Sequence, residues 1–587
     1  MNIKNTIEKK ISEIIRSVYQ ISDAALEVQQ NKSEFEGDFT IVTFPLVKIL
    51  KKSPDIIANE LGTAIAAQSD FVESYNIVKG FLNIKIKPQY FLENVQQLEK
   101  ILNHKPDRQE TVMVEYSSPN TNKPLHLGHI RNNLLGYSIA KILQEDGYQV
   151  IKTQIINDRG IHICKSMLAW QLRGDGVTPE SSGLKGDKLV GNYYVDFDKN
   201  YKTEIAELIA QGYDEDAAKK QAPSIKAAQQ MLVDWEKGDE DVRALWGTMN
   251  SWVYDGFGQT YRRLGVDFDQ VQYESNTYLL GKDLIQEGLN KGVFFRKEDG
   301  SVWVDLTDEG LDQKLLLRSD GTSVYMTQDL GTAVQRFQEN NIQKLIYTVG
   351  NEQDYHFQVL FKILKKLGYQ WADQLYHLSY GMVELPEGKM KSREGTVVDA
   401  DDLMQEMYET AREKAMELGK MEQLTEGEKE ASYEIIGLGA LKYFMLKVDP
   451  KKKMLFNPKE SIDFNGNTGP FIQYTYARIQ SLLAKAGFGE DTDMSVEQVN
   501  QHEKDLMMEL SNFREVVTKA AENLSPALVA NYIYEVVKTY NSFYQNNPVM
   551  NQEDEKIRNF RLYLSDLTGK TIKKSLDLLG IQTVNRM

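Results

Sequence analysis

Cysteine is almost absent from this sequence: Cys164 is the single one among 587 residues. A lone thiol forms no disulfide within the chain and cannot supply the ligands of a zinc ribbon, so we expect a reducing, cytoplasmic setting. Apolar runs of about 18 residues are also missing, which predicts no transmembrane helix. Residues 1–15 mix charged and apolar side chains throughout, which is not typical of a signal peptide.

Positive charge is in deficit, with 69 Lys and Arg against 85 Asp and Glu, a formal net charge of −16. A protein that coats nucleic acid needs a basic footprint, so this balance argues against that class. It still permits a local basic groove on an acidic body. Hydrophobic residues make up 41% and charged residues 26%, which excludes a disordered chain. At ~150 residues per domain, the length predicts about four domains.

The first 105 residues predict a small α/β unit. Ile3–Ile15 has helical periodicity, and the short apolar runs that begin at Phe39 and Phe81 are typical of strands. A polar linker that contains Pro106 ends this unit and sets the first domain boundary.

A strand–helix–strand unit follows the linker. The β-rich run Thr111–Glu115 is followed by a loop, by a helix from Leu127 and by a second strand, Val150–Asn157. So short a connection predicts a βαβ unit and therefore a parallel sheet. Further strands are expected at 301–306, 323–326 and 344–350.

Helices are expected to dominate the rest of the chain. Residues 170–245 are charged and dotted with glycine, which favours an insertion of surface helices. From Met404 onward the pattern is mostly helical, and the Gly/Pro/Asn punctuation at 464–470 separates a last helical bundle. The predicted fold class is α/β: a Rossmann-like parallel-sheet catalytic domain (106–464), a small α/β N-terminal domain (1–105) and an all-helical C-terminal domain (465–587).

Two motifs carry little weight. Thr568–Thr571 reads Thr-Gly-Lys-Thr like the tail of a P-loop, but Leu564 stands where the first glycine belongs and no strand precedes it. We interpret it as a solvated helix whose lysines face outward. His162 and Cys164 lack a partner pair at zinc spacing, so a buried cysteine beside a helix is favoured over a metal site.

The strongest chemical pattern lies in a loop and a helix start. Ser117–Arg131 follows a strand and opens a helix, so it lies at the carboxyl edge of a parallel sheet, where open α/β folds bind ligands. His126 and His129 fall on the first helical turn, and Gly128 between them leaves room for a base or phosphate. Two imidazoles beside free N–H groups suit a phosphate that gains charge in a transition state. Ordinary capping or core histidines are the alternative.

A second element is the basic loop Gly388–Thr396, in which Lys389 and Lys391 lie between glycines. Flexible, glycine-flanked lysines suit a lid that clamps a triphosphate, and a plain charged surface loop is the alternative. Together, His126-Leu-Gly-His and Lys389-Met-Lys-Ser-Arg resemble the HIGH and KMSKS signatures of class I aminoacyl-tRNA synthetases.

The residues around these signatures narrow the resemblance to the arginyl-tRNA synthetases of bacterial type. The segments that carry it are 115–131, 325–331, 350–357, 467–474 and the closing Leu-Gly-Ile…Arg-Met. The resemblance covers essentially the whole chain. Two departures exist: Ser392 stands at the second lysine of KMSKS, and residues 170–245 look longer than the family needs.

This resemblance implies an ATP-dependent ligase. ATP and L-arginine would give arginyl-adenylate and pyrophosphate, and the arginyl group would then move to tRNA(Arg) with release of AMP. His126 and His129 would stabilise charge at the α-phosphate, Gly128 would lie near the adenine, and Lys389 would hold the pyrophosphate. ATP would be accompanied by Mg²⁺, and no protein-bound metal such as zinc is implied.

The departure at Ser392 needs a compensating charge, because a hydroxyl cannot neutralise phosphate charge as an ammonium does. Lys123, three residues before His126, is the expected substitute on the ATP phosphates, and family members that lack the second lysine commonly carry a lysine there. Lys391, displaced by one residue, is the rival.

Arginine recognition requires carboxylate acceptors in fork geometry, since a guanidinium is planar and always charged. By resemblance, Tyr325 and Asp329, one helical turn apart, would bind this group. The residues that would hold the α-amino and carboxylate end are Ser118, Asn120 and Gln353, with Glu115 adding negative charge.

The terminal units resemble tRNA-binding domains: an additional N-terminal domain that touches the outer corner of tRNA, and a helical anticodon-binding domain. Residues 466–587 hold 13 Lys and Arg against 15 Asp and Glu, a net charge of 13 − 15 = −2. Recognition must therefore rest on local cations and on aromatic side chains that stack on unpaired bases. The candidates are Tyr474, Tyr476, Tyr532 and Tyr534, for which a core position is the alternative.

Two other functions remain as alternatives. One is another class I synthetase, such as a glutamyl or cysteinyl type, although the cysteinyl site needs Cys/His zinc ligands that one cysteine cannot supply. The other is a non-enzymatic tRNA-binding homologue, which loss of His126, His129 or Lys389 would mark, and all three are present. We expect a monomer without membrane contact.

Overall fold

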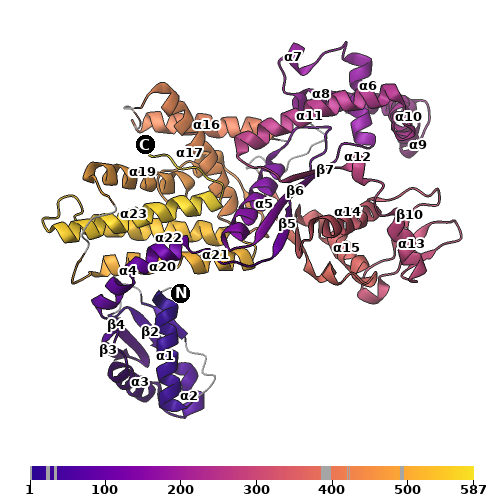
Figure 1. The fold of residues 1–587 in the computed structure, drawn as a ribbon. Coiled ribbons are helices and arrows are strands. Elements are labelled where there is room, and N and C mark those ends of the chain that lie inside the picture. The colour runs from indigo at the N-terminus through magenta and orange to yellow at the C-terminus, as the bar shows by residue number, and fades with distance from the viewer. Residues whose placement is uncertain are drawn as a thin grey trace.

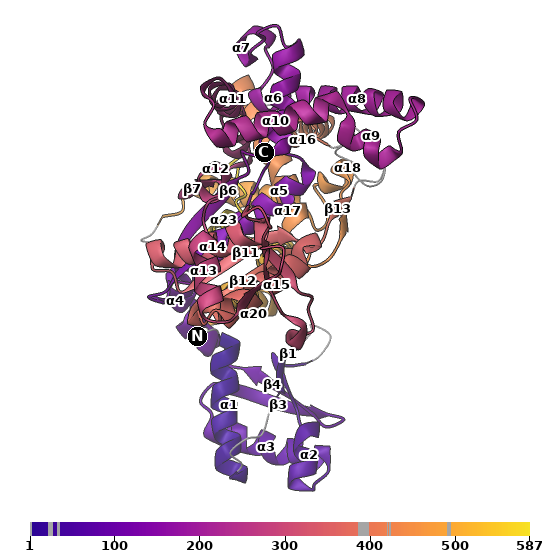
Figure 2. The same cartoon turned by 90° about the vertical axis from the view of Figure 1, so that its right-hand side faces the viewer.

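The computed structural model describes residues 3–20, 27–31, 36–384, 398–419, 421, 424–489 and 495–586. The molecule is elongated, as Figures 1 and 2 show. The N-terminal unit forms one end, a layer of helices within residues 161–264 forms the other, and the parallel sheet and the C-terminal helices lie between them. In the described part of the chain, no helix is both long enough and apolar enough to cross a membrane.

The N-terminal unit is a four-stranded antiparallel sheet with the order β1-β2-β4-β3, accompanied by helices. Ile7 and Ile11 of α1 are fully buried, which accounts for the helical period of this segment. The helix expected from Ile3 and the strands expected at Phe39 and Phe81 are confirmed. The elements are α1 (Ile3–Tyr19), β1 (Glu27–Gln30), β2 (Phe39–Val42), α2 (Phe44–Leu50), α3 (Pro54–Gln68), β3 (Val72–Val78), β4 (Phe81–Ile86) and α4 (Pro88–Asn103).

The central sheet has five parallel strands in the order β12-β11-β5-β6-β7, so the predicted α/β fold with a parallel sheet is confirmed. Its strands and first crossover helix are β5 (Thr111–Glu115), α5 (Leu127–Glu145), β6 (Gln149–Ile156), β7 (Gln270–Tyr273), β11 (Lys344–Gly350) and β12 (Leu375–Tyr380). The chain runs outward from β5 to β7 and then returns to β11 on the other side of β5. This reversal places a ligand-binding switch point at the carboxyl ends of β5 and β11.

The strand expected at 323–326 is wrong. Val324 precedes helix α14 (Tyr325–Asn340), whose buried residues Met326, Leu330 and Ala333 recur at helical spacing. The β-rich letters of this short run are also compatible with a helix start, and the following turns decide between the two. The strand expected at 301–306 exists as β9 (Val302–Val304), but it belongs to a separate antiparallel sheet with β8 (Phe294–Arg296) and β10 (Lys314–Leu317).

Between β6 and β7 the chain forms only helices and connections, as expected for residues 170–245. These helices are α6 (Ile161–Arg173), α7 (Pro179–Ser182), α8 (Gly186–Ala210), α9 (Glu215–Gln221), α10 (Pro223–Lys237) and α11 (Glu240–Leu264). After β7 come α12 (Glu274–Thr277) and α13 (Lys282–Asn290); α15 (Asp354–Lys366) connects β11 to β12. Figure 1 shows α6, α8, α10 and α11 stacked beyond the end of the sheet.

Where the structure describes it, the C-terminal part is helical, as expected, apart from a two-residue strand pair, β13 (Val383–Glu384) with β14 (Met454–Leu455). Its helices are α16 (Ala400–Glu417), α17 (Glu426–Leu446), α18 (Pro458–Ser461), α19 (Gly469–Ala486), α20 (Gln501–Ser511), α21 (Phe513–Glu522), α22 (Pro526–Asn546) and α23 (Glu555–Leu578). One expectation needs correction in part: Lys570 and Lys573 of α23 are exposed, as expected, but the helix is not solvated all round. Thr568 is fully buried, and Lys574 donates to the Leu102 carbonyl of α4.

The N-terminal unit is fixed to the C-terminal helices by charged side chains. Lys504 of α20 is buried and lies 3.3 Å from the equally buried Asp38, and it also donates to the Ile86 carbonyl at 3.1 Å. Lys570 of α23 pairs with Glu99 of α4 at 2.9 Å. Because both charges of the Lys504–Asp38 pair are desolvated, breaking it would leave an uncompensated buried charge.

Candidate active site

The loop from β5 to α5 begins in a constrained backbone conformation. Ser117 is buried and has a φ of 58°, a region that non-glycine residues rarely adopt. Its N–H donates to the Asn132 side chain on α5 at 2.5 Å, and its hydroxyl lies 2.7 Å from the hydroxyl of Tyr261. The amide of Asn132 also donates to the Thr348 carbonyl on β11 at 2.7 Å. Through Asn132, these hydrogen bonds link the loop after β5 to β11, the other strand at the switch point.

His126 and His129 form the N-terminal cap of α5. The Nδ1 atom of His126 accepts from the Gly128 N–H at 3.1 Å, and the Nδ1 atom of His129 accepts from the His126 N–H at 3.2 Å. Since each Nδ1 is an acceptor, each neutral ring carries its proton on Nε2 and can donate from there. The two ring centres lie 4.0 Å apart. The capping alternative is therefore confirmed, and it leaves both Nε2 atoms available for the expected role at a phosphate.

Burial keeps both rings neutral. It lowers the pKa of His126 to about 4, with a smaller contribution from the charge of Lys123. Burial also lowers the pKa of His129 well below its usual range, and His126 and Lys123 add to this effect. Two neutral Nε2–H donors at the start of a helix can stabilise a phosphate oxyanion without a competing proton equilibrium near pH 7.

Lys123 lies in the same loop and is partly buried. Burial lowers the pKa of its ammonium, and the described part of the chain offers it no ion pair. It lines a cavity of about 500 Å³ together with His126, Tyr194 and Asp399. Gly191 of α8 permits this arrangement, because a Cβ there would approach Pro124 to 2.8 Å. The insertion helix α8 thus forms one wall of the space beside the histidines.

Residues 398–400, which follow the basic loop, pair with the backbone of residues 125–127, here called the histidine loop. The Leu127 N–H donates to the Val398 carbonyl at 3.1 Å, and the Ala400 N–H donates to the Leu125 carbonyl at 2.9 Å. The start of α16 is further held by α8, since Lys185 lies 2.5 Å from Asp401. Lys389, Lys391 and Ser392 lie outside the described residues.

The expected guanidinium site lies on α14. Tyr325 and Asp329 are one helical turn apart, as expected, and the Tyr325 side chain is 72% exposed. The Asp329 carboxylate is 2.7 Å from Nε2 of His356 on α15. Gln353 lies in the turn between β11 and α15, at the carboxyl end of β11. These residues therefore gather at the predicted edge of the sheet.

Glu115, at the end of β5, forms an ion pair with Arg336 of α14, and both side chains are buried. The Ser118 hydroxyl donates to the other carboxylate oxygen of Glu115 at 3.3 Å. Asn120 is exposed in the following loop and bridges to Asn157 at the end of β6. The negative charge expected from Glu115 is thus largely neutralised by Arg336. The second carboxylate oxygen of Glu115 accepts from Ser118.

The family model described as tRNA synthetases class I (R), catalytic domain, matches residues 92–457, which is more than half of the chain. An arginine--tRNA ligase of Flavobacterium psychrophilum is 56% identical and one of Bacteroides thetaiotaomicron is 53% identical, each over the full length of both chains. The chain belongs to the class I arginyl-tRNA synthetases.

Two further models of this family's domains match the ends of the chain. The arginyl tRNA synthetase N terminal domain matches residues 1–86, and the DALR anticodon binding domain matches residues 472–587. A solved arginyl-tRNA synthetase of Thermus thermophilus, 26% identical, superposes over the whole of both chains with a TM-score of 0.78. Membership of this family excludes the alternative of a glutamyl or cysteinyl synthetase.

Three residues that lie beside the candidate site were not predicted from the sequence. Glu274 directly follows β7, and its burial raises the pKa of the carboxyl to about 7, with Asp158 and Asp329 adding to the rise and Arg159 opposing it. Arg159 stacks on Tyr278, 4.1 Å from its ring centre. His356 is the third. The position of Glu274 at a strand's carboxyl end was the available signal, because this edge already held the other candidates.

The aromatic candidates in the anticodon-binding domain divide into two pairs. Tyr476 and Tyr532 are buried, and the Tyr532 hydroxyl donates to the Glu509 carbonyl, so they belong to the core and not to a base-stacking surface. Tyr474 and Tyr534 are partly exposed. The helical packing of these domains, which one sequence cannot show, decides which face each ring occupies.

Within the described residues, no three His, Cys, Asp or Glu side chains gather as a metal site. Cys164 is buried on α6, as expected, and burial raises the pKa of its thiol to about 12. His162 lies 3.1 Å from the Tyr194 hydroxyl.

Proposed function

We infer that this chain ligates L-arginine to tRNA(Arg) in an ATP-dependent reaction that passes through arginyl-adenylate and releases AMP and pyrophosphate. The observation that carries this inference is the identity of more than half of all residues to an arginine--tRNA ligase over the full length of both chains. The site is consistent with it, because acidic side chains suited to a guanidinium lie at the same sheet edge as two neutral histidines.

In the activation step, His126 and His129 donate from Nε2 to the α-phosphate as its charge grows during attack by the arginine carboxylate. Lys123 adds a full positive charge beside them, which a desolvated site makes effective. Gly128 leaves space for the adenine, and Lys389 and Lys391 act on the departing pyrophosphate. These side chains form no covalent intermediate, so positioning and electrostatics supply the rate.

The substrate arginine is held at both ends. Asp329 accepts from the guanidinium while His356 fixes the carboxylate, and Tyr325 covers the group. Glu274 supplies a second acidic acceptor, since a guanidinium would stabilise the ionised form of its carboxyl. The residues that hold the α-amino and carboxylate end are Glu115, Ser118, Asn120 and Gln353.

The domain roles follow the same proposal. Residues 1–105 bind the outer corner of tRNA, residues 106–464 carry catalysis, and residues 465–587 bind the anticodon. Mg²⁺ bound with ATP would neutralise phosphate charge. The protein acts in the cytoplasm as a monomer.

The decisive assay is ATP–pyrophosphate exchange with each of the twenty amino acids, with and without tRNA(Arg). We expect exchange with L-arginine alone among them, and charging of tRNA(Arg) with arginine. A protein that binds tRNA(Arg) and gives no exchange under either condition would be a non-enzymatic homologue and would refute the proposal. A His126→Ala variant is the matched control, because it removes one phosphate donor and leaves the arginine pocket intact.

A further inference from the structure

Helix α14 carries two charged residues with different surroundings. Asp329 lies near its N-terminal end, and Arg336 follows seven residues later, which is about two helical turns. The Arg336 side chain is 1% exposed and pairs with Glu115 at the end of β5. Its Nε atom also donates to the Gln272 side chain on β7 at 2.9 Å. One buried guanidinium thus joins α14 to the central strand and to the edge strand of the sheet.

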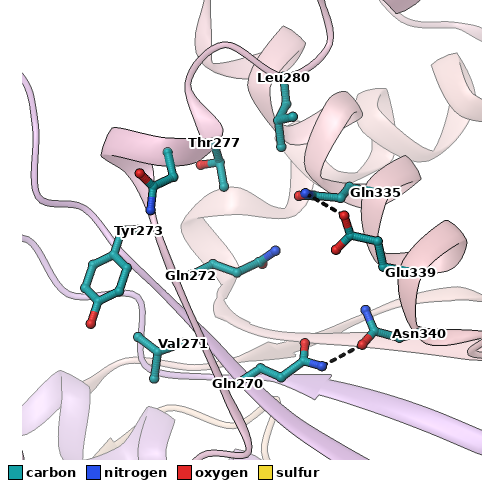
Figure 3. A pocket seen from close by; sticks show the side chains of 10 residues that line it. Gln270, Val271, Gln272, Tyr273, Thr277, Leu280, Gln335, Glu339 and Asn340 are labelled. Carbon is teal, nitrogen blue, oxygen red and sulfur yellow. Dashed lines mark hydrogen bonds between the residues drawn. The ribbon is translucent and has the colours of Figure 1, made fainter.

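The face of α14 toward β7 is held by polar contacts and not by close apolar packing. A cavity of about 420 Å³ lies between them. Figure 3 shows Gln270 and Gln272 on its strand side and Gln335 and Glu339 on its helix side. At the far end of the helix, Gln270 donates to Asn340 at 2.5 Å. The opposite face of α14 packs through Met326, Leu330 and Ala333 into an apolar cluster, so the polar contacts hold the helix on the side toward β7 alone.

The Arg336 contacts connect the two ends of the proposed arginine pocket. Glu115 lies at the end that receives the α-amino group, and Asp329 lies at the end that receives the guanidinium. Arg336 occupies one oxygen of Glu115, which leaves the oxygen beside Ser118 for the substrate. Buried Arg–carboxylate pairs are geometrically specific, so the pair fixes both the orientation of Glu115 and its separation from α14.

We propose that Arg336 is a positioning residue that sets the length of the arginine pocket and thereby selects arginine over homologues with one methylene more or fewer. The inference rests on the proposed roles of Glu115 and Asp329. A shift of α14 relative to β5 would break the ion pair between Arg336 and Glu115. A lysine at this position would keep a charge but would lose the Nε–H bond to Gln272 and the planar geometry of the guanidinium.

The test compares kcat/KM for L-arginine, L-homoarginine and L-norarginine in tRNA-dependent pyrophosphate exchange. One methylene is worth roughly 10- to 200-fold in a well-formed pocket. We expect Arg336→Lys to reduce discrimination against both analogues about tenfold or more and to raise the arginine KM, with the KM for ATP unchanged. Gln272→Leu keeps the ion pair and removes the Nε acceptor, so it should give a smaller loss in the same direction.

Gln270→Leu is the matched control, because it cuts the other side-chain contact between β7 and α14, at the end distant from Asp329. It should leave discrimination unchanged. An equal loss of discrimination in Gln270→Leu would mean that loosening α14 is enough to cause it, which would overturn a specific role for Arg336. Unchanged discrimination in Arg336→Lys would overturn the proposal outright. If Arg336→Lys fails to fold, Gln272→Leu decides: unchanged discrimination there overturns the proposal. A wild-type protein that activates no arginine at all would instead refute the proposed function.

Discussion

Replacing Lys123 with alanine tests how the site supplies the positive charge that Ser392 cannot. The Lys123 ammonium is partly buried, has no ion-pair partner in the described part of the chain, and lines the cavity that His126 also lines. Burying a charge is unfavourable unless it is paired, so a partly buried ammonium that lines this cavity suits an anion that arrives with the substrate.

The size of the effect follows from what the ammonium does. A positioned donor that stabilises developing oxyanion charge is worth about 2.7 kcal/mol or more, which corresponds to ~100-fold in rate. We therefore expect Lys123→Ala to lower kcat for adenylate formation ~100-fold, with the arginine KM little changed, because Lys123 lies in a different part of the site from Asp329. Ser392→Lys in the same background should restore part of the loss.

Pyrophosphate exchange with saturating and limiting L-arginine separates these quantities. Lys199→Ala is the control, since Lys199 lines the same cavity from α8 and is exposed. If Lys391→Ala is the crippling change and Lys123→Ala is nearly silent, the compensation lies within the basic loop. The assignment of Lys123 would then be wrong.

Three further outcomes are expected. Asp329→Asn should raise the arginine KM roughly 30-fold, which corresponds to about 2 kcal/mol. This value is at the low end for the loss of a charged partner, because the Asp329 carboxylate is 44% exposed. An unchanged arginine KM would refute the assignment of Asp329. Protonation of Glu274, whose pKa is about 7, removes a charge, so the arginine KM should rise as pH falls below 7. Glu274→Gln should abolish that dependence, and an unaltered profile would show that another group titrates. Raising salt should increase the tRNA KM much more than the KM of arginine or ATP, because phosphate contacts are screened, and equal sensitivity would contradict a separate tRNA footprint.

Local pattern predicted the parts of the fold that local sequence controls. The β5–α5–β6 unit has a β-rich run, a helical period and a short connection, and each is visible within a window of about fifteen residues. The run at 323–326 failed because four residues cannot distinguish a strand from the first turn of α14. The partners of β9 were also out of reach, since pairing depends on residues that lie elsewhere in the chain.

The candidate site divides in the same way. His126, His129 and Asp329 stand out because their motifs are contiguous, but the neutral state of the histidines depends on burial that the whole fold creates. Glu274 and Arg336 carry no motif. Each acquires its surroundings from strands that are distant in sequence: Arg336 meets Glu115 across 221 positions.

The pairing of residues 398–400 with residues 125–127 has a mechanical consequence. Its two hydrogen bonds join backbone to backbone, so substitution of side chains along either segment leaves them in place. Proline is the exception. At position 400, the first residue of α16, proline suits a helix start and would preserve the helix, yet it removes the N–H that reaches Leu125. A change that is benign for the helix would thus remove one of the two hydrogen bonds between the segments and leave the bond from Leu127 to Val398 as the remaining one.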